Sequence, residues 1–225
     1  ICSFNCVYCE CGWTTSNYSN FVDLETFENA LTEKLLKMNS EGEFADAFTF
    51  AGNGEPTLHP EFDKIIDITI RLRNKYSPES KIAVLSNATT LQREEVFIAL
   101  SKIEKNILKL DAGSEHTYNL INQSNTNIRL DEIVENLSRF EGNLIIQTLF
   151  MRAKFNTEVI DNTTEEEIKL LIEHLRKIRP QEMMIYPISR GTPLEDIEKI
   201  SILELEEIKK KINSELPEIE ISVFA

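Results

Sequence analysis

Three cysteines at the start of the chain have a spacing that suits a metal or cluster site. Cys2, Cys6 and Cys9 follow a Cys-x3-Cys-x2-Cys pattern, and with Cys11 they are the only cysteines of this 225-residue chain. A single turning loop with this spacing can aim three thiolates at one point, which is the arrangement that a tetrahedral ion or an iron–sulfur cluster needs.

The position of the fourth cysteine helps to distinguish a zinc site from a cluster site. A structural zinc ion takes a fourth protein ligand, but Cys9 and Cys11 are separated by one residue, which is a tight bite for a shared ion. A cluster held by three cysteines needs no fourth protein ligand and keeps one iron open. The spacing favours such a cluster, with zinc binding and redox thiols as the alternatives and Cys11 as a neighbouring free thiol.

Composition narrows the class of protein. Cysteines this close together would close only tiny disulfide loops, so metal ligation in a reducing compartment, and hence a cytoplasmic location, is favoured. With 41% hydrophobic and 28% charged residues, and no apolar run of the ~18 residues that suggest a membrane span, we expect a soluble protein. A net charge of −14 repels polyanions and disfavours nucleic acid as a partner.

Strand and helix patterns alternate along the chain, which indicates a single α/β domain over residues 1–225. Strands are predicted over 47–51, 81–87, 107–111, 144–150, 183–188 and 219–224. Helices are predicted over 24–39, 94–100 and 130–139, and around the apolar stripes 62–70, 170–175 and 205–212. Right-handed βαβ units of this kind build a mainly parallel sheet, whose functional groups gather at the carboxyl ends of the strands.

Several helix ends can be predicted from local signals. Asp23 is a plausible cap for the first helix, and Pro60 suits the first helical position of the second. Thr164-x-x-Glu167 and Ser201-x-x-Glu204 have the form of capping boxes. The segment 113–129 is predicted to be a polar loop.

A glycine-rich turn follows the first predicted strand. Gly52-Asn53-Gly54-Glu55-Pro56 contains two glycines, which tolerate backbone angles that other residues resist. Such a turn is by itself weak evidence for function, because most are only turns. Its occurrence after the cysteine loop, on an α/β alternation, is much more specific.

Together the two motifs resemble those of the radical S-adenosylmethionine (SAM) enzymes. Cys2-x3-Cys6-x2-Cys9, with Tyr8 before the last cysteine, is similar to their signature loop. The turn resembles their Gly-Gly-Glu-Pro motif, with Asn53 as an extra residue. The sequences Lys-Leu-Asp-Ala-Gly and Tyr-Pro-Ile-Ser-Arg-Gly-Thr-Pro extend the resemblance over nearly the whole chain. It is strongest to short iron–sulfur oxidoreductases related to the wybutosine-synthesis radical SAM enzymes.

The resemblance implies a fold and a chemistry. The fold is a partial (β/α)6 barrel in which the cluster loop follows the first strand, and we expect that strand to be missing from this sequence, which begins at the loop. Cys2, Cys6 and Cys9 would hold a [4Fe–4S] cluster whose open iron binds SAM. An electron donor such as flavodoxin or ferredoxin would reduce the cluster, SAM would be cleaved, and the resulting 5′-deoxyadenosyl radical would act on an unknown substrate.

The resemblance also assigns cofactor-binding residues by their position in the motifs and at strand ends. Gly52, Gly54 and Glu55 would receive the methionyl ammonium group of SAM. Further candidates beside the cluster, ribose, carboxylate, adenine or substrate are Tyr8, Ser86, Asn87, Asp111, Gln147, Tyr186 and Ile188. Turn formation and core packing are the alternative explanations for these residues.

Two further hypotheses remain open. One is a non-catalytic zinc or iron–sulfur module, which would need only the cysteine loop. The other, narrower hypothesis is a radical SAM enzyme that modifies tRNA, and the acidic net charge of −14 counts against it. Lys109 and Asp111 should face the same side of their strand, where they could orient a substrate or form a buried ion pair.

Overall fold

The fold is built on one sheet covered by a succession of helices. A computed structural model describes residues 1–13 and 21–224, and in this part of the chain the sheet has the strand order β1-β2-β3-β4-β6-β8. These strands are parallel to one another. Their bounds are Ala47–Phe50, Lys81–Ser86, Lys105–Lys109, Ile145–Phe155, Glu182–Pro187 and Glu220–Val223.

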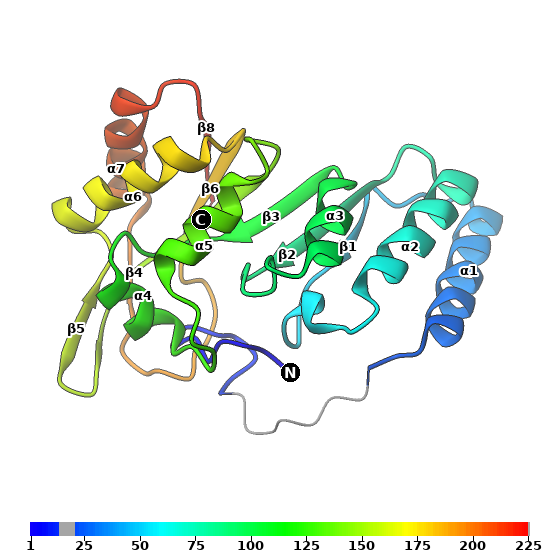
Figure 1. The fold of residues 1–225 in the computed structure, drawn as a ribbon, viewed down its shortest axis with the longest axis horizontal. Helices are drawn as coiled ribbons and strands as arrows, with labels where there is room; N and C mark the ends of the chain where they lie inside the picture. The colour runs from blue at the N-terminus through cyan, green and yellow to red at the C-terminus, as the bar shows by residue number, and fades with distance from the viewer. Residues whose placement is uncertain (14–20, 225) are drawn as a thin grey trace.

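Helices connect consecutive strands. Figure 1 shows them following one another along the sheet, from α1 at one end to α7 at the other. Their bounds are α1 Leu24–Glu41, α2 Phe62–Tyr76, α3 Glu94–Ser101, α4 Glu115–Asn122, α5 Leu130–Ser138, α6 Glu165–Ile178 and α7 Ile202–Glu215. Because right-handed crossovers that always step in one direction keep the helices on one face, this strand order produces a partial barrel rather than a doubly wound sheet. The predicted α/β class with a parallel sheet is confirmed.

The two faces of the sheet have different chemistry. Leu108, Ile146 and Ile185 are buried in the main hydrophobic core, which the helices share. Lys109 on β3 lies in register with Gln147 on β4, and Gln147 with Met184 on β6. Since paired residues of neighbouring strands point to the same face, the inner face of the barrel carries polar side chains in the middle of the sheet.

The prediction of a polar loop over 113–129 is wrong, because α4 occupies Glu115–Asn122 within this segment. Ser114 caps this helix by accepting a hydrogen bond from the backbone N–H of Thr117 at 3.1 Å. Tyr118 and Ile121 are buried and provide its apolar side. In a helix of this length, the two buried apolar positions are too few to stand out as a periodic pattern in a polar sequence.

Strand boundaries also differ from the prediction. The third strand was expected over 107–111 but runs from Lys105 to Lys109, so Asp111 lies beyond its carboxyl end. β4 continues past the predicted 144–150 and pairs antiparallel with β5 (Glu158–Asp161) and β7 (Glu198–Lys199). These additions were missed because they are short and polar.

The helix-start predictions have mixed outcomes. Asp23 caps α1 by accepting a hydrogen bond from Thr26 N at 2.9 Å, and the capping box of Ser201 and Glu204 is complete. Pro60 was wrong as a first helical residue, because α2 begins at Phe62 after a cap at Glu61.

The second expected capping box forms only in part. The Thr164 hydroxyl accepts a hydrogen bond from Glu167 N at 3.2 Å. The Glu167 carboxylate turns away from this cap and accepts hydrogen bonds from Gly113 N at 2.8 Å and from the Thr117 hydroxyl at 2.8 Å. Glu167 therefore ties the loop after β3, and α4 with it, to α6.

Glu204 gives a pH-dependent prediction. Hydrogen bonds from Arg152 and Ser201 lower the pKa of Glu204 to about 2 from 4.5. Because the folded-state pKa is depressed, the stabilisation is present above 4.5 and is lost as pH falls toward 2. We expect the thermal unfolding midpoint to fall over this interval, and to fall less in Glu204→Gln. The exposed Glu207→Gln on the same helix is the control, and identical curves for all three proteins would contradict the assignment.

Within the described residues, no helix is both long and apolar enough to cross a membrane.

Candidate cluster and cofactor site

The two motifs meet at one cavity. Its volume is about 270 Å³, and the thiol-bearing residues Cys2, Cys6 and Cys9 line it together with Gly52, Asn53 and Gly54. The cysteine loop thus lies against the loop that follows β1. The cavity is the place where a group bound by the cysteines would touch the glycine-rich turn.

A direct backbone contact holds these two loops together. The N–H of Glu55 donates a hydrogen bond to the carbonyl oxygen of Ile1 at 2.9 Å. Gly54 has a φ of +124°, and a Cβ atom at this position would lie 2.2 Å from the Ile1 carbonyl oxygen. Gly52 has a φ of +113° but no atom within 4 Å of a Cβ there. Gly54 is therefore required both for its backbone angle and for the close approach of the cysteine loop.

The cysteine loop is also anchored from its other side. Val7 N donates to the carbonyl of Ile121 at 3.0 Å, and Asn5 N donates to the carbonyl of Asn122 at 2.9 Å. Figure 1 shows the blue N-terminal segment close to α4. Leu194 N donates to the carbonyl of Val7 at 3.3 Å, so the segment after β6 contacts the loop as well. The loop is held by backbone contacts on several sides, which fixes where the thiols point.

Tyr8 anchors the loop to the inner face of the barrel. Its ring is buried, and its hydroxyl donates to Asp111 Oδ2 at 2.5 Å. Asp111 Oδ1 accepts from Leu149 N at 2.8 Å, and Lys109 Nζ lies 3.5 Å from Oδ1. Burial first, and then the charge of Asp111, raise the pKa of Tyr8. Asp111 therefore stays an acceptor and Tyr8 a donor, which defines the direction of their hydrogen bond.

Lys109 continues this network to β6. Its Nζ donates to the Tyr186 hydroxyl oxygen at 2.6 Å and lies 5.0 and 5.2 Å from the ring centroids of Tyr8 and Tyr186. Burial lowers the pKa of Lys109, but the Asp111 carboxylate, Tyr186 and Cys6 together outweigh this effect, and the net direction is upward. The expectation that Lys109 and Asp111 share a face is confirmed by their contact.

Glu55 connects the glycine-rich turn to the end of β2. Its Oε1 accepts from Thr57 N at 3.1 Å and from the Thr57 hydroxyl at 2.5 Å, and its Oε2 accepts from Asn87 N at 2.7 Å. Burial raises the pKa of Glu55, and these hydrogen bonds oppose the effect. Thr57 was missed by the sequence reasoning, although a threonine two residues after Glu55 is a recognisable capping signal.

Asn87 lies against the cysteine loop, while Ser86 bonds to the backbone of the turn that follows β2. Asn87 Nδ2 donates to the Ser3 hydroxyl at 2.9 Å and lies 3.5 Å from Cys2 Sγ. The Ser86 hydroxyl accepts from Ala88 N at 3.1 Å. Ser3 also contacts the Thr89 hydroxyl at 2.6 Å, a link between the loops that no sequence signal indicated.

The remaining candidates lie further into the barrel. Gln147 and Tyr186 line a second cavity of about 270 Å³. Ile188 is not part of its wall but is buried with Val7 and Tyr8 in a smaller hydrophobic cluster under the cysteine loop. The structure therefore brings Gln147 and Tyr186 together and places Ile188 as a packing residue beside the loop.

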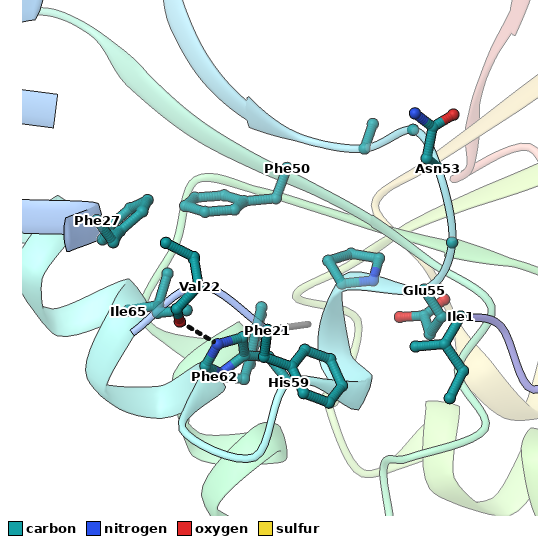
Figure 2. A pocket seen from close by; sticks show the side chains of 14 residues that line it. Ile1, Phe21, Val22, Phe27, Phe50, Asn53, Glu55, His59, Phe62 and Ile65 are labelled. Atoms are coloured by element: carbon teal, nitrogen blue, oxygen red, sulfur yellow. Dashed lines mark hydrogen bonds between the residues drawn. The ribbon is translucent and has the colours of Figure 1, made fainter. Parts of the chain in front are cut away.

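A larger apolar cavity of about 510 Å³ borders the glycine-rich turn. Figure 2 shows Phe27 of α1, Phe50 of β1 and Ile65 of α2 around it. His59 lies in its wall, but Nε2 contacts the Val22 carbonyl at 2.9 Å and Nδ1 accepts from Glu61 N at 3.1 Å. Both ring nitrogens are engaged, so this cavity has no free histidine ligand.

The cysteine loop lines a cavity that has room for a cluster. In residues 1–13 and 21–224, no group of three His, Cys, Asp or Glu side chains could hold one metal ion. Cys2, Cys6 and Cys9, together with Cys11, line a cavity of about 270 Å³, which gives room for several iron and sulfide atoms. Burial raises the pKa of Cys2 and of Cys6, so a cationic group is needed to hold them as thiolates.

The Asp111 network leads to a stability prediction. Asp111→Asn removes the charged acceptor of the Tyr8 hydroxyl and leaves Lys109 without its carboxylate in a buried place, so we expect a loss of about 3 kcal/mol in the free energy of unfolding. Urea denaturation of the protein without cofactors measures it. Asp67→Asn is the matched control, because Asp67 forms an exposed ion pair with Lys102 that is worth at most about 1 kcal/mol. Equal losses in the two variants would contradict the role of Asp111.

Comparisons with known proteins agree with the geometry. The family model described as the Radical SAM superfamily matches residues 1–175. A protein of Brachyspira hyodysenteriae named GTPase Obg is 29% identical over 93% of this chain, but the match spans 29% of that protein. A UPF0026 protein of Synechocystis is 31% identical over 86% of the chain and 68% of its own length. The chain thus spans from less than a third to about two thirds of these relatives.

Solved structures show the same fold. Streptococcus suis SuiB bound to S-adenosylmethionine aligns with all of this chain and 48% of its own, with a TM-score of 0.70 and 14% identity. A radical SAM methyltransferase from Sphaerobacter thermophilus aligns with 99% of the chain and 63% of its own, with a TM-score of 0.71 and 14% identity. At this identity the likeness establishes the partial-barrel fold alone.

Proposed function

Since the chain belongs to the radical SAM superfamily, we propose that it is an enzyme that cleaves SAM reductively at a [4Fe–4S] cluster. The observation that carries the proposal is the single cavity at which Cys2, Cys6, Cys9 and the glycine-rich turn meet. The cysteine loop alone could hold a cluster but would lack a wall for the cofactor. A site with both motifs can present a cluster and a cofactor to each other.

The cysteine loop has the tasks of holding the cluster and keeping it in place. Cys2, Cys6 and Cys9 would be its ligands. A cluster held there would supply, when reduced, the electron for the reductive cleavage of SAM. Tyr8, through its bond to Asp111, and Val7, through its bond to the backbone of α4, fix the loop above the inner face of the barrel.

The glycine-rich turn has the task of binding the amino-acid end of SAM. Gly52 and Gly54 line the cavity without side chains, on either side of Asn53. The Glu55 carboxylate would balance the ammonium group of SAM, and Asn87, which contacts both Glu55 and the cysteine loop, would orient it. An ammonium group beside Glu55 would also offset the cost of its burial.

Metal content separates the enzyme from a non-catalytic module. After anaerobic reconstitution, we expect about four irons and four sulfides per chain. One zinc per chain, with no sulfide, would replace the proposal by a structural zinc module. Iron content does not distinguish the enzyme from a non-catalytic iron–sulfur module. The purified protein should therefore also be incubated with SAM and a reductant, and SAM cleavage would exclude such a module.

A further inference from the structure

We propose that the second cavity binds an acyl group of the substrate, a carboxylate or a carboxamide, through the hydroxyl of Tyr186 and the amide of Gln147. This inference rests on the proposed function, because it concerns the substrate of that enzyme. The residues that line this cavity of about 270 Å³ are Gln147, Met184, Tyr186, Pro187, Ser189 and Phe224.

The cavity lies on the inner face of the barrel, next to the network under the cysteine loop. Gln147 on β4 is in register with Lys109 on β3. Tyr186 on β6 contacts Lys109, which contacts Asp111, the residue that holds Tyr8. A group bound in this cavity would therefore be connected to the cluster loop through four consecutive side chains.

The contact with Lys109 determines the polarity of Tyr186. An ammonium group has only donors, so the Tyr186 oxygen must accept the 2.6 Å hydrogen bond. The hydrogen of the Tyr186 hydroxyl then points away from Lys109, and in the described part of the chain the bond from Lys109 is the only one found for this hydroxyl. Tyr186 is thus a free donor, made stronger by a neighbouring cation, and it calls for an acceptor oxygen.

Gln147 offers complementary groups beside this donor. Its side chain lines the cavity and, among the described residues, has no hydrogen bond of its own. The amide supplies both a donor and an acceptor. A carboxylate can accept from both Tyr186 and Gln147, and a carboxamide can in addition donate to the Gln147 oxygen. An ammonium group could use only one of these partners.

Charge also favours an acyl oxygen over a cation. Among the described residues that line the cavity, none is acidic. The neighbouring carboxylates are already paired, Asp111 with Lys109 at 3.5 Å and Glu182 with Lys105 at 3.4 Å. In a chain with a net charge of −14, the described lining residues of this cavity present no like charge to an anion. Met184, Pro187 and Phe224 provide an apolar wall for the carbon chain that bears the acyl group.

Matched four-carbon probes test this chemistry. Binding of butyrate, butyramide and butylammonium to the reconstituted protein can be measured by ligand-observed NMR at constant ionic strength and with saturating SAM. We expect butyrate and butyramide to bind at least about tenfold more tightly than butylammonium, a difference of about 1.4 kcal/mol. Tyr186→Phe and Gln147→Leu should each remove most of this preference. Tyr76→Phe, at the end of α2, removes a hydroxyl far from the cavity wall and should retain it.

Three outcomes would overturn the inference. The first is that butylammonium binds as tightly as butyrate and butyramide. The second is that Tyr186→Phe and Gln147→Leu both keep the preference for the acyl probes. The third is that SAM displaces butyrate, which would make the cavity part of the cofactor site. SAM cleavage, measured on the same preparation, tests the proposed function separately. Cleavage without acyl preference refutes only the acyl site, and acyl preference without cleavage refutes only the proposed function.

Discussion

Replacing Cys2, Cys6 or Cys9 by alanine is expected to abolish both the cluster and SAM cleavage. Each of these residues lines the cavity shared with the glycine-rich turn, and a cluster with two protein ligands would have two open irons. We expect the charge-transfer absorption of the reconstituted protein and its iron content to fall to background in all three variants. Formation of 5′-deoxyadenosine from SAM should fall below detection at the same time.

Cys11→Ala is the control for these variants. Cys11 is exposed and lines the same cavity, where its thiol is 3.4 Å from the side-chain oxygen of Asn53. If three ligands suffice, Cys11→Ala should retain about four irons per chain and most of the activity. A variant of Cys2, Cys6 or Cys9 that keeps the full cluster and cleaves SAM would remove that residue from the ligand set.

Gly54→Ala is expected to have the second largest effect. A methyl group at this position would lie 2.2 Å from the Ile1 carbonyl oxygen, and the φ of +124° is strained for any residue with a side chain. The cysteine loop and the turn would have to separate, which moves the thiols away from the cofactor-binding wall. We expect SAM affinity to fall by at least about tenfold, or about 1.4 kcal/mol, as measured by equilibrium binding to the reconstituted protein.

Two other glycines separate strain from contact. Gly52 has a comparable φ of +113°, but a Cβ atom there would have no atom within 4 Å. Gly52→Ala should therefore show the cost of backbone strain alone. Gly191→Ala has neither a strained φ nor a close neighbour and should behave as wild type. If Gly54→Ala binds SAM as tightly as Gly191→Ala does, the backbone contact between Ile1 and Glu55 is not needed for the site.

The fold could be predicted from the sequence where patterns were long and periodic. The buried strands of the parallel sheet and the long helices each carry several apolar residues at a clear period, and their positions were confirmed within a few residues. The failures share a physical cause. α4 has only two buried apolar residues, and β5 and β7 are short strands that pair with β4, so tertiary contacts and not local pattern define them.

The site could be predicted in part. Spacing alone indicated that Cys2, Cys6 and Cys9 act together, while Glu55 and Asn87 were indicated by the resemblance to the radical SAM motifs and strand ends. The partners of these residues could not be read from the sequence. That Tyr8 donates to Asp111, and that Lys109 reaches Tyr186 across β4, depends on strand register, which a single sequence does not encode locally. Half of the expected capping box at Glu167 was redirected in the same way.

The most direct test of the account is to incubate the anaerobically reconstituted protein with SAM and dithionite and to quantify 5′-deoxyadenosine and methionine. The account predicts equal amounts of both products, no cleavage without reductant, and no cleavage in the variant in which Cys6 is replaced by alanine. A protein that carries the full cluster and binds SAM, but forms no 5′-deoxyadenosine when the cluster is reduced, would contradict it.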